Sequence, residues 1–113
     1  MGDPARKAAL YEALALAGQA LASGKRLELL GLLAQGERSV DALARAAGLG
    51  LTTCSAHLQT LRRAGLVTTR REGVRVHYRL AGEDVAALLA LLEQVACTRL
   101  ASAGAARTAY GAA

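Results

Sequence analysis

Phenylalanine and tryptophan are absent from this 113-residue chain, and three tyrosines are its only aromatic residues. Because 53% of the residues are hydrophobic, the chain can still bury a core, which must consist of leucine, alanine and valine. Such a core is thin for this length, and small domains of this kind often complete their core by dimerisation. The composition therefore predicts one domain that pairs with a second copy of itself.

The chain also has few cysteines and only short apolar runs. Cys54 and Cys97 are the only cysteines, and their number and spacing match neither a disulfide framework nor a zinc knuckle. The longest uninterrupted apolar run, residues 85–92, is far too short to span a bilayer. Residues 1–18 carry Glu12 inside their apolar stretch and lack the layout of a signal peptide. We therefore expect a soluble cytoplasmic protein without a membrane partner.

Acidic residues are almost missing from one segment, which holds the whole excess of positive charge. Residues 62–79 contain six arginines and one acid, Glu72. The chain has 14 basic and nine acidic residues in total, so the remainder is balanced at eight of each. A net charge of +5 concentrated in this way suits a polyanionic partner such as nucleic acid.

The first 64 residues have the apolar spacing and the stop signals of four helices. The first helix is expected to start at Asp3-Pro4 and to carry an apolar stripe of Leu10, Leu14, Ala17 and Leu21. The second is expected at 25–35. Ser39 caps a third, 40–47, and Thr52 can cap a fourth that runs to Ala64. The last two are short and are joined by a turn with two glycines, which predicts a helix-turn-helix unit.

After Gly65 the apolar period changes from helical to two, which is typical of strands. Segments 66–70 and 74–80 are expected to pair through a turn at Glu72-Gly73, with Val74 on the apolar face and His77 on the outer face. A last helix follows at 83–100. Residues 102–113 lack an apolar face and are expected to form a disordered tail.

The predicted order is therefore α-α-α-α-β-β-α, a mainly α fold. A helix-turn-helix followed by an arginine-rich hairpin is a winged helix-turn-helix, which we assign to residues 1–101. A recognition helix needs short side chains where it meets base edges, and positive charge where it meets phosphates. The residues that we predict to contact DNA are Thr52, Thr53, Ser55, Ala56, Gln59, Arg62 and Arg63 on the helix and Arg70, Arg71 and Arg75 on the hairpin. A merely solvated surface is the alternative.

The segment KRLELLGLLAQGERSVDALARAAGLGLTTCSAHLQTLRRAGLVTTRREGVRVHYRL, residues 25–80, resembles the ArsR/SmtB family of bacterial winged-helix regulators almost without gaps. The resemblance implies a homodimer on a palindromic operator, paired through the first and last helices. Most members repress a promoter until a metal ion or an oxidant releases them. The residues expected in the dimer interface are Leu10, Leu14, Leu21, Leu88, Leu92 and Val95.

The residues with which such regulators bind metal are largely missing. One site of the family has two cysteines at the start of the third helix, where this chain has Ser39 and Asp41. The other site lies on the last helix, where the corresponding residues are Gly82, Asp84, Val95 and Thr98. Because one carboxylate cannot replace thiolates and imidazoles, we expect no metal site at these positions. Weak nickel or zinc binding by surface groups such as His77 remains open.

Oxidants are the other input that the resemblance implies. Some members of the family sense oxidants through a cysteine pair on the second and last helices, whereas Cys54 lies on the recognition helix. Cys54 and Cys97 are thus a candidate redox pair that departs from the family pattern. Cys54 and His57 lack an orienting partner and an oxyanion loop, so no enzyme is expected. The alternative function is a small helical interaction module or co-regulator that receives a metal or redox signal from a separate sensor protein.

Overall fold

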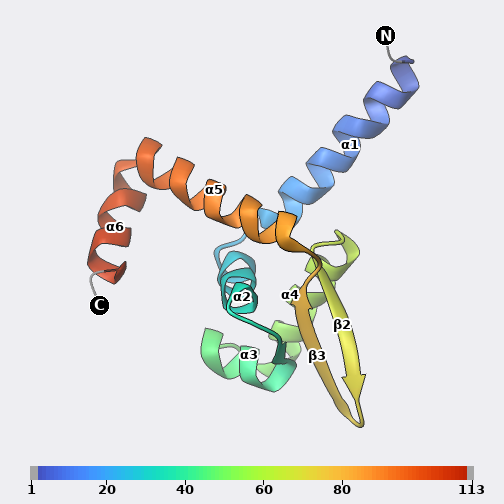
Figure 1. Cartoon of the computed structure of the whole chain (residues 1–113), viewed down its shortest axis with the longest axis vertical. Helices are drawn as coiled ribbons and strands as arrows, with labels where there is room; N and C mark the ends of the chain where they lie inside the picture. The colour runs from blue at the N-terminus through green and yellow to red at the C-terminus, as the bar shows by residue number, and fades with distance from the viewer. Residues whose placement is uncertain (1–2, 112–113) are drawn as a thin grey trace. The chain divides into compact units, whose positions relative to one another are not determined.

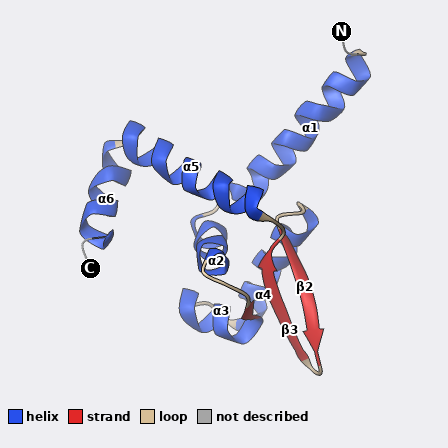
Figure 2. Ribbon diagram, viewed as in Figure 1, coloured by secondary structure: helices blue, strands red, loops and turns tan. Residues whose placement is uncertain are grey.

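The structure is a computed structural model that describes residues 3–111 (Figures 1 and 2). Its elements in chain order are α1 (Pro4–Leu21), α2 (Gly24–Ala34), β1 (Arg38–Ser39), α3 (Val40–Ala47), α4 (Leu51–Arg63), β2 (Val67–Glu72), β3 (Arg75–Leu80), α5 (Glu83–Arg99) and α6 (Ala101–Gly111). The predicted mainly α winged-helix order is confirmed, with β1 and α6 as additions. The chain divides into two compact units, up to Gly82 and from Glu83 onward.

Hydroxyl caps and glycines set the ends of the central helices. Ser23 Oγ accepts a hydrogen bond from Arg26 N, and Ser39 Oγ accepts one from Ala42 N, each at 3.2 Å. Gly48 ends α3 with a left-handed backbone, at φ 66°. The prediction that Thr52 caps α4 is wrong, because Gly50 is the cap residue and the helix begins at Leu51. Thr52 therefore lies inside the first turn of α4.

The core of the first unit is built mostly from leucine, alanine and valine, as the composition predicts, and also contains Cys54 and Tyr78. Its fully buried side chains are Leu29, Leu30, Leu43, Cys54, Leu58, Leu61 and Val67. Three of these, Cys54, Leu58 and Leu61, recur at helical spacing on α4. Their burial fixes which side of α4 is left for a partner.

The hairpin of β2 and β3, which we call the wing, is part of a three-stranded sheet in the order β1-β3-β2. Strand β1 has only two residues, and Arg38 pairs with Tyr78. The turn of the wing lies at Gly73–Val74, and Gly73 has φ 62°, as a two-residue hairpin loop requires. The expected turn at Glu72-Gly73 is therefore one residue too early. Val74 lies in the turn with 95% of its surface exposed, and not on the apolar face of the wing.

The second unit consists of α5 and α6, which are bent by 114° at the break between them. The expected disordered tail is wrong for residues 102–111, which form most of α6, while 112–113 lie outside the described residues. Alanine favours a helix here, and Gly104 allows the two helices to touch. A Cβ atom at Gly104 would come within 3.0 Å of the carbonyl oxygen of Cys97.

Within residues 3–111, no single helix is long and apolar enough to cross a membrane. The bent pair of α5 and α6 meets the length and composition requirements only when its two helices are taken together.

Candidate nucleic-acid interface

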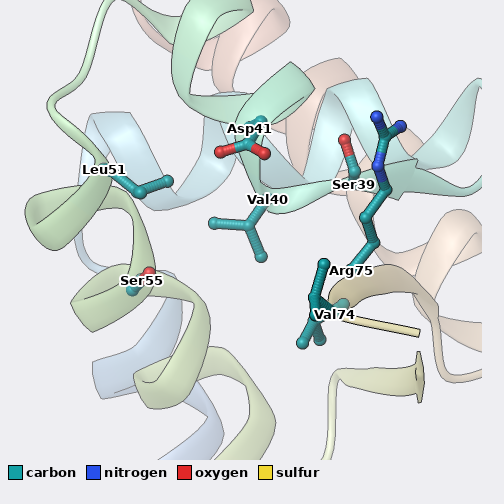
Figure 3. Close-up of a pocket in the computed structure, with 8 residues that line it drawn as sticks. Ser39, Val40, Asp41, Leu51, Ser55, Val74 and Arg75 are labelled. Carbon is teal, nitrogen blue, oxygen red and sulfur yellow. The ribbon is translucent and has the colours of Figure 1, made fainter. Parts of the chain in front are cut away.

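A groove separates α4 from the wing. Its first part has a volume of about 370 Å³ and is shown in Figure 3; it is lined by Ser39, Val40, Asp41, Leu51, Ser55, Val74, Arg75 and Val76. Its second part, of about 310 Å³, is lined by Val40, Ser55, Gln59, Arg62, Thr69, Arg71, Val76 and Tyr78. The two parts share three lining residues and so adjoin each other. We call them together the helix–wing groove.

Helical and strand periodicity explain why these side chains meet. Ser55, Gln59 and Arg62 follow each other at i, i+4 and i+7 along α4, so they lie on one side of that helix. Arg71 alternates with Arg70 in β2 and lies on the face of the wing that turns toward α4. The structure thus brings five of the predicted DNA-contacting residues to the helix–wing groove: Ser55, Gln59, Arg62, Arg71 and Arg75.

The other predicted residues lie elsewhere. Thr52, Thr53, Ala56 and Arg63 are exposed on α4 but do not line the groove. Sequence reasoning missed Thr69, which lines the groove and pairs in register with a buried tyrosine of β3. The period-two pattern of this segment already placed Thr69 on the same face as Arg71. That alternation was the signal that could have identified it.

Arg70 lies on the opposite face of the wing from Arg71 and is held by Glu37. Arg70 Nη2 lies 2.7 Å from Glu37 Oε1, and Arg70 Nε donates to the same carboxylate at 3.2 Å. This hydrogen bond holds the pKa of Glu37 below its ordinary value and raises the pKa of Arg70. Arg70 therefore fixes the wing to the loop before β1. Its role could not be seen locally, because its partner is 33 residues away.

His77 lies on the same face as Arg70, opposite it in the register. Its side chain is only 16% exposed, and its Nε2 atom lies 3.4 Å from Glu72 Oε1 without hydrogen-bond geometry. His77 thus lies on the predicted face of the wing, but it is largely covered and not an open surface group. The physical reason is that β3 is the central strand, so His77 has neighbours on both sides, including Ser39.

Four arginines near the groove carry charge that is not neutralised. Arg62, Arg63, Arg71 and Arg75 are exposed, and none forms a salt bridge with any acidic residue in the described part of the chain. Asp41, at the start of α3, is the acidic residue that lines the groove. The charge of these four arginines, two on α4 and two on the wing, is thus available to a polyanion.

The two cysteines are free thiols in different units. Cys54 is fully buried, and this burial raises the pKa of its thiol. Since the thiolate is the reactive form, Cys54 is not activated for redox chemistry in this environment. Cys97 is half-buried, and its Sγ atom lies 3.9 Å from the carbonyl oxygen of Ala103. The redox role of this pair stays a prediction.

Histidine, cysteine and acidic side chains are dispersed over the molecule. Across residues 3–111, no group of three of them is gathered in a way that could hold a metal ion.

Sequence comparisons relate the chain to known regulators. A family model described as a helix-turn-helix domain matches residues 21–70. HTH-type transcriptional regulator Rv0324 of Mycobacterium tuberculosis is 58% identical over 100 residues, which make up 88% of this chain and 44% of that protein. The chain thus spans less than half the length of that relative. Transcriptional activator HlyU of Vibrio cholerae is 39% identical over 79 residues, covering 70% of this chain and 73% of HlyU.

Solved structures extend this similarity to the whole fold. One is the solution structure of a Mycobacterium bovis domain, described as a homodimeric winged helix-turn-helix DNA-binding domain of a possible ArsR-family regulator. It has a TM-score of 0.82 and 57% identity over 88% of this chain and 93% of that domain. Another, Rv0081 of M. tuberculosis, has a TM-score of 0.76 and 35% identity, covering 89% of this chain and 97% of that one. The named relatives are transcriptional regulators, in agreement with the prediction that the chain is not an enzyme. Fold and sequence together show that the chain belongs to the ArsR/SmtB family of winged-helix transcriptional regulators.

Proposed function

We propose that this protein regulates transcription in the cytoplasm by binding a palindromic DNA operator as a homodimer. The observation that carries the proposal is the helix–wing groove, with a hydroxyl and a carboxamide on α4 and unneutralised arginines around it. When a recognition helix enters the major groove and a wing contacts the neighbouring backbone, a phosphate strand has to pass between them. The similarity to a DNA-binding domain of M. bovis supports this arrangement.

The residues that line the groove fall into two groups by their chemistry. Ser55 and Gln59 have polar groups of the kind that recognise base edges, while small residues in the first turns of α4 let the helix approach the bases. We assign Arg62, Arg71 and Arg75 to phosphate contacts, because they are exposed cations without a salt bridge in the described part of the chain. In contrast to the sequence-based prediction, we assign Arg70 to holding the wing, because Glu37 already neutralises it.

This division of roles between base contacts and phosphate contacts can be tested directly. The operator for the test is first selected from a random DNA library with the unmutated chain. We expect Ser55→Ala to lower operator affinity about five-fold or more and to leave affinity for random DNA unchanged, because it removes a base contact. Arg71→Ala should weaken binding to both DNAs by the same factor. Fluorescence anisotropy at one salt concentration measures the affinity of each variant, and of the unmutated chain, for both DNAs. Identical behaviour of the two variants would contradict the division of roles.

Homodimerisation is supported by apolar side chains that α1 and α5 each leave exposed. On α1, Leu10 and Leu14 are 56% and 55% exposed, whereas Leu21 is half-buried. On α5, the predicted interface residues Leu88, Leu92 and Val95 are 40%, 38% and 54% exposed. Exposed leucines in such number are typical of a surface that a partner covers. The homodimer described for the M. bovis domain supports the same assembly here.

We also propose that the protein has no tight metal site of its own. The start of α3 has Ser39 and Asp41 in place of thiolates, and Asp84 at the start of α5 accepts a hydrogen bond from Val85 N at 3.0 Å. The effector stays unidentified. The signal would then have to come from a separate sensor protein, from a thiol change or from the concentration of the regulator itself.

Titration calorimetry with zinc or nickel tests this proposal. We expect micromolar or weaker binding that Asp84→Ala leaves almost unchanged, because a lone carboxylate is a poor ligand for either ion. His77→Ala is the comparison variant, because His77 Nε2 lies 3.4 Å from Glu72 Oε1. A sub-nanomolar site that disappears in Asp84→Ala would show instead that α5 holds a metal sensor.

A further inference from the structure

One side-chain hydrogen bond joins α4 to the wing within the described residues. Gln59 Nε2 donates to the phenol oxygen of Tyr78 at a distance of 3.4 Å. Gln59 is exposed, and both residues line the second part of the helix–wing groove. A proposed base-contacting residue is therefore tied to a buried tyrosine of the wing.

Tyr78 is a rigid attachment point. It lies on the central strand of the sheet, with Arg38 opposite it on β1 and Thr69 opposite it on β2. Only 3% of its surface is exposed. Burial raises the pKa of its phenol, so the hydroxyl stays protonated at neutral pH. The position of the phenol oxygen is thus set by the sheet and not by solvent.

The hydrogen bond leaves the carboxamide of Gln59 able to recognise a base. A carboxamide has two N–H donors and one acceptor oxygen, and only one N–H is engaged by Tyr78. The remaining N–H and the oxygen match the N7 acceptor and the N6 donor that adenine presents in the major groove. This pairing needs both groups in one plane, and a glutamine held in advance loses less rotational freedom on binding than a free one.

We infer that Tyr78 is a positioning residue for sequence recognition, which orients the Gln59 carboxamide toward an adenine edge in the major groove. The inference rests on the DNA binding proposed above. It makes the base preference of α4 depend on a residue of the wing that does not itself touch a base. The wing then has two separate tasks, since Arg71 contributes charge and Tyr78 contributes geometry.

The test uses the full chain and an operator selected from a random library. Tyr78→Phe removes only the hydroxyl, and we expect the preference for adenine at one base position to fall about five-fold while affinity for random DNA is unchanged. Gln59→Ala should lose the preference at the same position. In the Gln59→Ala background, Tyr78→Phe should then have no further effect on it. Thr68→Val is the matched control, because it deletes a hydroxyl on the other face of the wing, beside Arg79 Nε at 3.3 Å.

A measurement without DNA examines the contact itself. In the free protein, the NMR signals of the Gln59 side-chain amide should shift in Tyr78→Phe and stay in place in Thr68→Val. The positioning role would be overturned if Tyr78→Phe left the amide signals or the base preference unchanged. It would also be overturned if Tyr78→Phe had an equal effect on base preference in the Gln59→Ala background, because Tyr78 would then act through packing alone. Failure of the unmutated chain to select any DNA would overturn the proposed function and this inference with it.

Discussion

Raising the salt concentration from about 50 mM to about 200 mM should lower the affinity for DNA on the order of 10⁴-fold. The reason is the number of arginines that can meet phosphates. Each protomer exposes four of them, Arg62, Arg63, Arg71 and Arg75, without a salt bridge to the acids of residues 3–111. A dimer then makes about eight contacts, and each neutralised phosphate contributes ~0.9 to the magnitude of the slope of log affinity against log salt. Fluorescence anisotropy at several salt concentrations gives this slope directly.

Two neighbouring arginines provide the control for this measurement. Arg71→Ala should reduce the slope by about 2, because a dimer loses two phosphate contacts. Arg70→Ala makes the same change in charge one residue away, but Glu37 already neutralises Arg70, so the slope should change less. A slope shallower than about 2 in the unmutated chain would mean that the arginines do not face phosphates. That result would favour a protein-interaction module over a DNA-binding regulator.

The second large effect is expected from Leu92→Glu on α5. Leu92 is 38% exposed, and we propose that a second copy covers it. A carboxylate buried in that interface would lose several kcal/mol of solvation, so the variant should be monomeric or insoluble. A soluble monomer contacts one half-site instead of two that lie about 34 Å apart, so operator affinity should fall by at least about 100-fold. Light scattering at micromolar concentration measures the mass, and anisotropy measures the affinity.

The matched control is Gln94→Glu, which adds the same charge to α5 two residues further on. Gln94 is exposed, and two residues along a helix correspond to about half a turn, so the new carboxylate points away from the side of Leu92. The control should stay dimeric and bind the operator normally. A monodisperse monomer for the unmutated chain would show that the exposed leucines of α1 and α5 have another purpose.

Local patterns in the sequence determined the fold class and most of the recognition helix. Cys54, Leu58 and Leu61 recur at helical spacing, so the buried side of α4 follows from the order of residues alone, and with it the exposed Gln59 and the partly exposed Ser55. The change to period two after Gly65 located the wing for the same reason. Residue identity also determined that the family's metal-binding thiolates are missing, since no fold can supply a ligand that the chain lacks.

Other features were decided only by tertiary structure, because they depend on residues far apart in the chain or on elements too short to show a period. Strand β1 has two residues and exists only because β3 lies beside it. Glu37 and Arg70 are 33 residues apart, and Gln59 and Tyr78 are 19 apart; neither pair can be recognised from local spacing. Strand alternation puts two adjacent arginines on opposite faces of the wing, but only the packing of α4 against the sheet decides which of them faces the groove. The same packing brings the buried Tyr78 into contact with Gln59, the residue that we propose to recognise a base.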